Sequence, residues 1–190
     1  MTNISQINAL IPFASDYGLR IHASMLAKEI NRPQKTISRQ LNSYCETGLL
    51  KYKREGKNKL YYLDLEDPAT KTLLNLVESY KSIEFLCKNK KIALLIKELC
   101  KKATVILFGS YAKGKATPES DIDLVIMGSR KSAEEIIKKY PFKVSLQYIT
   151  VQKLKTLIKE KNALALEIKK DHIIFNNFEE IINIFMEPKR

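Results

Sequence analysis

Two short helices are predicted near the start of the chain by the spacing of its apolar residues. Leu26 and Ile30 share one face of residues 23–30, a spacing typical of a helix. Pro33 then suits the first turn of a second helix, because a proline lacks the N–H that has no partner at a helix start. Apolar residues mark the buried side of this second helix, and a glycine placed to end it follows: Ile37, Leu41, Tyr44 and Gly48.

A β-hairpin is predicted next, in the stretch LLKYKREGKNKLYYLD. Apolar and basic residues alternate there as in half-buried strands, and EGKN supplies the turn. The hairpin sets five cations against one acid, Glu55; the cations are Lys51, Lys53, Arg54, Lys57 and Lys59. A hairpin of this charge suits contact with the phosphates of a nucleic acid.

Polar side chains project from the N-terminal half of the second helix, at Gln34, Lys35, Ser38 and Arg39. In a helix that enters the major groove, these positions meet the edges of the bases. Helix, turn, helix and basic hairpin, over residues 1–65, resemble the winged helix-turn-helix domain of prokaryotic transcriptional regulators. The resemblance implies binding to double-stranded DNA, whereas a winged helix that makes only protein contacts is the alternative.

A helical region is predicted between residues 66 and 102. Apolar residues recur in it at alternating spacings of three and four, as along the seam of a helix pair: Leu73, Leu76, Tyr80 and Ile83. Two explanations stay open, a helix that forms a homodimer and a helix that packs onto the following domain. A dimer would suit a reader of palindromic DNA sites.

The composition narrows the class of protein. The 190 residues carry a formal net charge of +12, which favours polyanions, although a lysine-rich solubilising surface gives the same total. The three cysteines are odd in number and widely spaced, which argues against a disulfide framework and a zinc site. With no apolar run long enough for a bilayer and no signal peptide pattern, the sequence predicts a soluble, cytoplasmic protein.

Two buried strands in the last half of the chain frame a pair of carboxylates. TVILFGS predicts a strand that ends at Gly109, and SDIDLVIM predicts a second strand with Asp121 and Asp123 on one face. Two carboxylates so close together are costly unless a cation neutralises them, and Mg²⁺ prefers carboxylate and phosphate oxygens together. The residues expected to hold the phosphates of a nucleoside triphosphate are Gly109, Ser110, Lys113 and Ser120.

The stretch GSYAKGKATPESDIDLVI resembles the signature of minimal nucleotidyltransferases of the polymerase-β-like superfamily, and the likeness covers residues 90–185. The resemblance implies a small mixed β-sheet flanked by helices, a triphosphate donor and metal-assisted chemistry. It also implies that Asp121 and Asp123 are catalytic and bind the metal ions. The expected fold class is therefore α+β with two domains: a winged helix at 1–65, a helical connector at 66–102 and a nucleotidyltransferase-like domain at 103–190.

The chain departs from the family pattern in two places. Lys113 stands where the family often has arginine, which keeps the charge but loses the two-pronged hydrogen bonding. The third carboxylate of active members is expected on the next strand, KVSLQYI, which contains Ser145 and Gln147 but no acid. Glu134 and Glu135 precede that strand on a predicted helix and are poor substitutes.

Three functions fit this pattern. The first is a DNA-binding transcriptional regulator whose C-terminal domain binds Mg²⁺ and a nucleoside triphosphate, with little or no transfer. The second is an active nucleotidyltransferase that modifies a protein, an RNA or a small molecule, as in antitoxin-like proteins. The third is a DNA-binding protein with a vestigial second domain, which the intact pair Asp121 and Asp123 disfavours.

Overall fold

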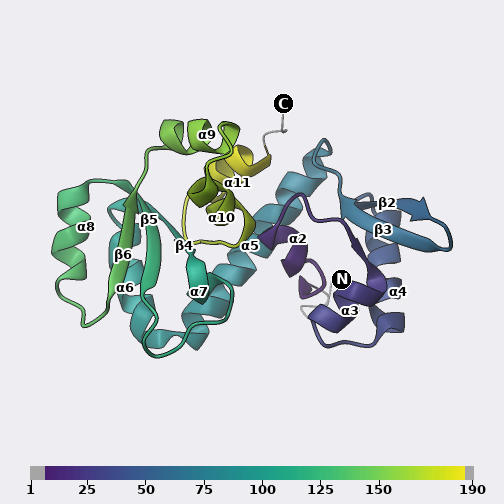
Figure 1. Ribbon diagram of the computed structural model, residues 1–190, viewed down its shortest axis with the longest axis horizontal. Helices are drawn as coiled ribbons and strands as arrows, with labels where there is room; N and C mark the ends of the chain where they lie inside the picture. Colours follow the sequence, from purple (N-terminus) through teal and green to yellow (C-terminus); the bar gives the residue numbers. More distant parts are fainter. Residues whose placement is uncertain (1–6, 187–190) are drawn as a thin grey trace. The chain divides into compact units, whose positions relative to one another are not determined.

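The computed structural model describes residues 7–186 (Figure 1). The chain forms two compact units, residues 1–77 and residues 78–190. A long helix, α5 (Pro68–Lys88), begins in the first unit and ends in the second.

The N-terminal unit combines short helices with a three-stranded antiparallel sheet in the order β1-β3-β2. Its elements are α2 (Ile11–Ser15), β1 (Ile21–His22), α3 (Ala23–Glu29), α4 (Gln34–Glu46), β2 (Leu50–Glu55) and β3 (Asn58–Leu63). The two helices and the hairpin predicted from the sequence are confirmed. The two-residue strand β1, which pairs with β3, was not predicted because it is too short to show a pattern.

The local sequence explains where α4 starts and stops. Pro33 is the N-cap residue of the helix, one position before the first turn in which the sequence predicted it, because its ψ of 130° is not helical. Asn31 takes a left-handed φ of 51° in the turn from α3. Gly48 follows the helix at φ 79°, the left-handed stop that its sequence position predicts. The buried side of the helix is the predicted one, with Ile37, Leu41 and Tyr44.

Helix α5 has apolar side chains on more than one face. The predicted seam includes Leu76 and Ile83, whose exposed fractions are 53% and 60%. Leu74, Val77 and Phe85 are the buried apolar residues of the helix instead. The seam is therefore present on the surface, and its role in a homodimer stays a prediction.

The C-terminal unit is built on a four-stranded mixed sheet in the order β6-β5-β4-β7. Strands β4 and β5 are antiparallel, whereas β5 and β6 are parallel; Figure 1 shows these three strands side by side. The strands are β4 (Ala103–Phe108), β5 (Ile122–Gly128), β6 (Val144–Tyr148) and β7 (Ile173–Ile174). The helices are α6 (Lys90–Cys100), α7 (Gly109–Ala112), α8 (Arg130–Ile137), α9 (Val151–Lys159), α10 (Ala163–Lys170) and α11 (Phe178–Met186).

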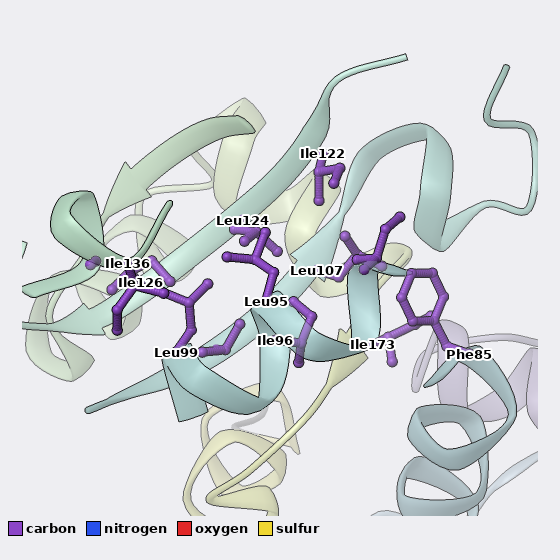
Figure 2. Close-up of a cluster of buried hydrophobic side chains, with 13 residues drawn as sticks. Phe85, Leu95, Ile96, Leu99, Leu107, Ile122, Leu124, Ile126, Ile136 and Ile173 are labelled. Atoms are coloured by element: carbon purple, nitrogen blue, oxygen red, sulfur yellow. The ribbon is translucent and has the colours of Figure 1, made fainter. Parts of the chain in front are cut away.

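One apolar cluster holds this sheet against α6 and α8. In Figure 2, Leu124 and Ile126 of β5 lie with Leu95 and Leu99 of α6 and Ile136 of α8. Because side chains alternate along a strand, Ile106 and Val125 point to the opposite face. These two side chains are fully buried as well, so both faces of the sheet are covered. The small mixed sheet flanked by helices is thus confirmed.

Candidate functional sites

The junction of β4 and α7 lies directly against the second aspartate. Phe108, the last residue of β4, pairs with Asp123 of β5. Gly109 follows at φ 69°, a left-handed backbone that favours glycine. A Cβ at this position would collide with the Asp123 carboxylate. The sequence needs glycine here because the backbone of the turn and the carboxylate share the same space.

Asp123 is held in an environment that opposes its own charge. Burial is the main cause that raises the pKa of the Asp123 carboxyl, and the charges of Asp121 and Glu167 raise it further. A hydrogen bond from Ser145 and the positive charge of Lys113 act the other way. A partly buried carboxylate whose charged form is disfavoured is a good place for a cation to bind, because the cation removes that cost.

Asp121 lies immediately before β5, and its side chain is exposed. The prediction that the two aspartates share a face assumed that both belong to the strand, whereas β5 starts at Ile122. The charge of Asp121 nonetheless raises the pKa of the Asp123 carboxyl. Asp123 is therefore fixed by the sheet, whereas Asp121 lies in the loop that leads into β5.

The loop between α7 and β5 carries the other residues predicted to hold phosphate. Lys113 is exposed, and its Nζ donates a hydrogen bond of 2.6 Å to Glu167 Oε1 on α10, which raises the pKa of Lys113. Ser120 Oγ accepts a hydrogen bond of 2.9 Å from the backbone N–H of Thr117, closing a turn. Glu167 was not predicted as a site residue, since it lies 54 positions from Lys113 and no local spacing connects the two.

Strand β6 is the expected third strand beside the aspartates. Ser145 pairs with Asp123 and Gln147 with Val125, which confirms that KVSLQYI is the neighbouring strand and places Ser145 nearest to the site. Glu134 lies on α8, where Arg130 Nε donates to it at 2.8 Å. Ser145 therefore occupies the position where the resemblance led us to expect an acid.

The donor set for a metal ion is small. Among residues 7–186, no three or more His, Cys, Asp or Glu side chains come together as a metal cluster. Asp121 and Asp123 supply two carboxylates at most. Mg²⁺ is often held in proteins by one or two carboxylates with substrate phosphates and water, so this pair fits a metal ion that arrives with a nucleotide.

A second candidate surface lies in the N-terminal unit. Gln34, Lys35 and Arg39 of α4 are exposed and Ser38 is half-buried. The hairpin cations Lys51, Lys53, Arg54 and Lys57 are exposed, while Lys59 is half-buried. Lys51 is paired with Asp64 at 2.5 Å, and Lys59 donates to Asn42 of α4 at 2.7 Å. The predicted DNA-binding residues thus divide into freely exposed side chains and side chains with protein partners.

Comparison with known proteins bears on the C-terminal unit. A family model described as a nucleotidyltransferase domain matches residues 89–188, more than half of the chain. A protein of Methanocaldococcus jannaschii named "Putative protein adenylyltransferase MJ1379" is 49% identical over 43 residues, which are 23% of this chain and 40% of that protein. No solved structure matches the chain. In the described residues no helix is long and apolar enough to cross a membrane. On the extent of the family match, the chain belongs to the nucleotidyltransferase domain family.

Proposed function

We propose that the C-terminal unit binds a nucleoside triphosphate together with Mg²⁺ at Asp121 and Asp123. The observation that carries this proposal is the close approach of Gly109 to the Asp123 carboxylate. Because Gly109 has no side chain, only backbone lies between the turn and the carboxylate on that side. A phosphate can then come close to the peptide groups of the turn while its metal ion is held by the aspartates.

ATP is the nucleotide we propose. The support is the name of the M. jannaschii relative, which describes adenylyl transfer, over the matched 43 residues. Gly109, Ser110, Lys113 and Ser120 are the residues proposed to hold its phosphates. The chain's own residues would orient the nucleotide and hold its charge, and the metal ion would supply Lewis acid chemistry at the phosphate.

Calorimetry with Mg²⁺ and ATP tests this site. The double variant Asp121→Asn, Asp123→Asn keeps the shape of both side chains but removes their charge, so we expect ATP affinity to fall at least thirtyfold. Glu119→Gln is the matched control, since it neutralises an exposed acid of the same loop. Equal binding by wild type and the double variant would mean that the aspartates have a structural role.

Transfer of the nucleotide is proposed to be slow in this chain. Ser145 stands beside Asp123 where an acid is needed to activate the attacking hydroxyl of the acceptor. We expect Ser145→Asp to increase labelling of the protein or of an added acceptor by radioactive ATP. The gain should disappear when Asp121→Asn is added.

An active adenylyltransferase is the second candidate function, supported by the relative's name. Its expected outcome differs clearly from the first. Wild type would then transfer AMP efficiently, with release of pyrophosphate, and Asp121→Asn would abolish transfer. Some other group would have to act as the base in place of an acid at position 145.

We further propose that the N-terminal unit is a winged helix that binds duplex DNA and makes the protein a transcriptional regulator. The support is the order of helices and hairpin, with Lys35 and Arg39 exposed on α4 and Lys53, Arg54 and Lys57 exposed on the hairpin. Arg39→Ala should weaken a selected DNA site about tenfold more than random DNA, as expected for a residue that contacts bases. Equal losses of affinity for the selected site and for random DNA would show that Arg39 contacts the DNA backbone and not the bases.

A homodimer through α5 is proposed as the form that binds DNA. Leu76 and Ile83 are exposed large apolar residues of that helix, and a two-fold protein matches inverted repeats. Replacing both by Lys should produce a monomer in light scattering. A wild-type protein that stays monomeric with and without DNA would remove this proposal.

A further inference from the structure

Lys59 has a different environment from the other cations of the hairpin. Its Nζ donates a hydrogen bond of 2.7 Å to Asn42 Oδ1, and the same oxygen accepts a bond of 3.0 Å from Tyr61 Oη. The ammonium also lies 4.1 Å from the centre of the Tyr52 ring, a cation–π contact. His22 Nδ1 lies 3.0 Å from the backbone oxygen of Lys59. The Lys59 side chain is therefore held by Asn42 and Tyr52, and its backbone oxygen lies beside His22.

Asn42 places this network on a particular side of α4. Residues three and four apart are neighbours on a helix surface, so Asn42 lies one turn beyond Ser38 and Arg39 on the same side. These are the two α4 residues nearest to Asn42 that are proposed to meet DNA. A link from the hairpin to Asn42 thus fixes the distance between the hairpin cations and the proposed base contacts.

We propose that Lys59 is a positioning residue that joins the hairpin to α4, and that it does not bind a DNA phosphate. The side chain is half-buried, one of its three N–H groups donates to Asn42, and its charge lies over the Tyr52 ring. Lys57, two positions earlier, is exposed at the turn and serves as the phosphate contact. A pre-organised hairpin binds more tightly than a loose one, because less conformational freedom is lost when DNA binds. The inference rests on the proposed DNA binding and adds a division of roles among the lysines.

The salt dependence of binding separates the two roles. Each phosphate contact contributes about 0.9 to the slope of log K against log salt concentration. Lys57→Met should lower the slope by about 0.9 and weaken selected and random DNA alike. Lys59→Met should leave the slope nearly unchanged and weaken the selected site about tenfold, with little effect on random DNA. A slope for Lys59→Met that falls as much as for Lys57→Met would overturn the proposal.

Asn42→Leu breaks the same link from the other end without removing a positive charge. It should reproduce most of the loss seen in Lys59→Met, and the double variant should lose clearly less than the sum of the two single losses, since both changes break the same Lys59–Asn42 hydrogen bond. Full additivity of the two losses would show that Lys59 and Asn42 act separately and would also overturn the proposal.

Amide hydrogen exchange tests the link without DNA. In Lys59→Met and Asn42→Leu, but not in Lys57→Met, amides of Leu50–Glu55 and Asn58–Leu63 should exchange at least fivefold faster. Unchanged exchange in both variants would show that the contact does not hold the hairpin. If wild type binds no duplex, the proposed DNA function fails, while the exchange experiment still decides whether Lys59 fixes the hairpin.

Discussion

The two units of this protein present their candidate residues in opposite ways. In the N-terminal unit Lys35, Arg39 and Lys57 extend into solvent. In the C-terminal unit Asp123 is partly buried, hydrogen-bonded to Ser145 and pressed against Gly109. Exposed, flexible cations suit a long polyanion whose phosphates offer many equivalent contacts. A fixed carboxylate suits a small ligand whose reacting atoms must be placed closely.

The two units also differ in how their charged residues are distributed along the chain. Residues 1–77 contain 11 Lys and Arg and 7 Asp and Glu, whereas residues 78–190 contain 22 and 14, which gives net charges of +4 and +8. The unit proposed to bind DNA is thus the one with the smaller net charge. Its cations are concentrated instead, with five of the 11 between residues 51 and 59. Concentration of charge in one hairpin, more than the total charge of the unit, supports nucleic-acid binding.

Replacing a turn glycine in each unit should give the largest difference between them. Gly56 and Gly109 both have left-handed φ, 59° and 69°, so alanine brings strain of about 1 kcal/mol at either position. At Gly56 no atom lies within 4 Å of the added Cβ, whereas at Gly109 the Cβ meets the Asp123 carboxylate. We expect Gly109→Ala to abolish ATP binding and to lower the free energy of unfolding by about 3 kcal/mol.

Gly56→Ala is the control, and it should lower that free energy by only about 1 kcal/mol. Chemical denaturation followed by circular dichroism measures both changes. If the two variants lose equal stability and Gly109→Ala still binds ATP, the turn is not tightly packed against Asp123.

Salt should separate the ligands of the two units by the next largest factor. With about five cations on phosphates, the affinity for DNA should fall on the order of 10² to 10³ between 50 and 200 mM salt. ATP binding with Mg²⁺ should fall less than about tenfold, because partly buried charges are screened less. Titrations at four salt concentrations measure both slopes. A steeper slope for ATP than for DNA would contradict the comparison between the units.

A buried charged cluster should make the C-terminal unit sensitive to acid. His172 Nε2 lies 3.0 Å from Glu78 Oε1, and Lys81 Nζ lies 3.0 Å from Glu78 Oε2, with all three side chains buried. Burial lowers the pKa of His172, against the attraction of Glu78. The unfolded chain, with a histidine pKa of about 6.5, therefore binds more protons than the folded one.

Stability is consequently present above pH 6.5 and lost as the pH falls, by up to about 1.4 kcal/mol per pH unit for one proton. Burial raises the pKa of Glu78, but Lys81 and His172 lower it by more, so the pKa is lowered overall. Glu78 therefore adds to the loss of stability at more acidic pH. Denaturation at pH 7.5 and 5.5 measures the change. His172→Gln should flatten the dependence between these values.

The sequence predicts those features of the fold that depend on neighbouring residues. The start and stop of α4, the hairpin, and the strands β4 and β5 all follow from local spacing and from proline and glycine. The seam in α5 shows where such reasoning becomes ambiguous. That helix has apolar residues on several faces, and spacing alone does not decide which face is buried.

The candidate sites were predicted less completely, because their partners come from distant parts of the chain. Ser145 was found through the family resemblance and its strand register is confirmed. Glu167, which holds Lys113, and His172, which contacts Glu78 from 94 positions away, have no sequence pattern that connects them. Asn42 and Lys59 likewise meet only once the hairpin folds onto α4. Long-range pairs of polar residues are set by the fold and are not visible in local spacing.

The smallest expected effect concerns the ion pair between Lys113 and Glu167. In this pair an exposed cation of the loop has a protein partner. Lys113 must exchange Glu167 for a phosphate when a nucleotide binds, and the Glu167 charge also acts unfavourably on Asp123. Glu167→Gln should therefore increase ATP affinity about two- to threefold, because breaking a partly exposed ion pair costs little free energy. The gain should shrink at high salt and should be smaller in a Lys113→Met background, where no ion pair is left to break.

Glu160→Gln, which neutralises an exposed acid outside the site, is the control. Weaker ATP binding by Glu167→Gln would show that Glu167 positions Lys113 for the phosphates, and that this part of the site is as firmly organised as Gly109 and Asp123.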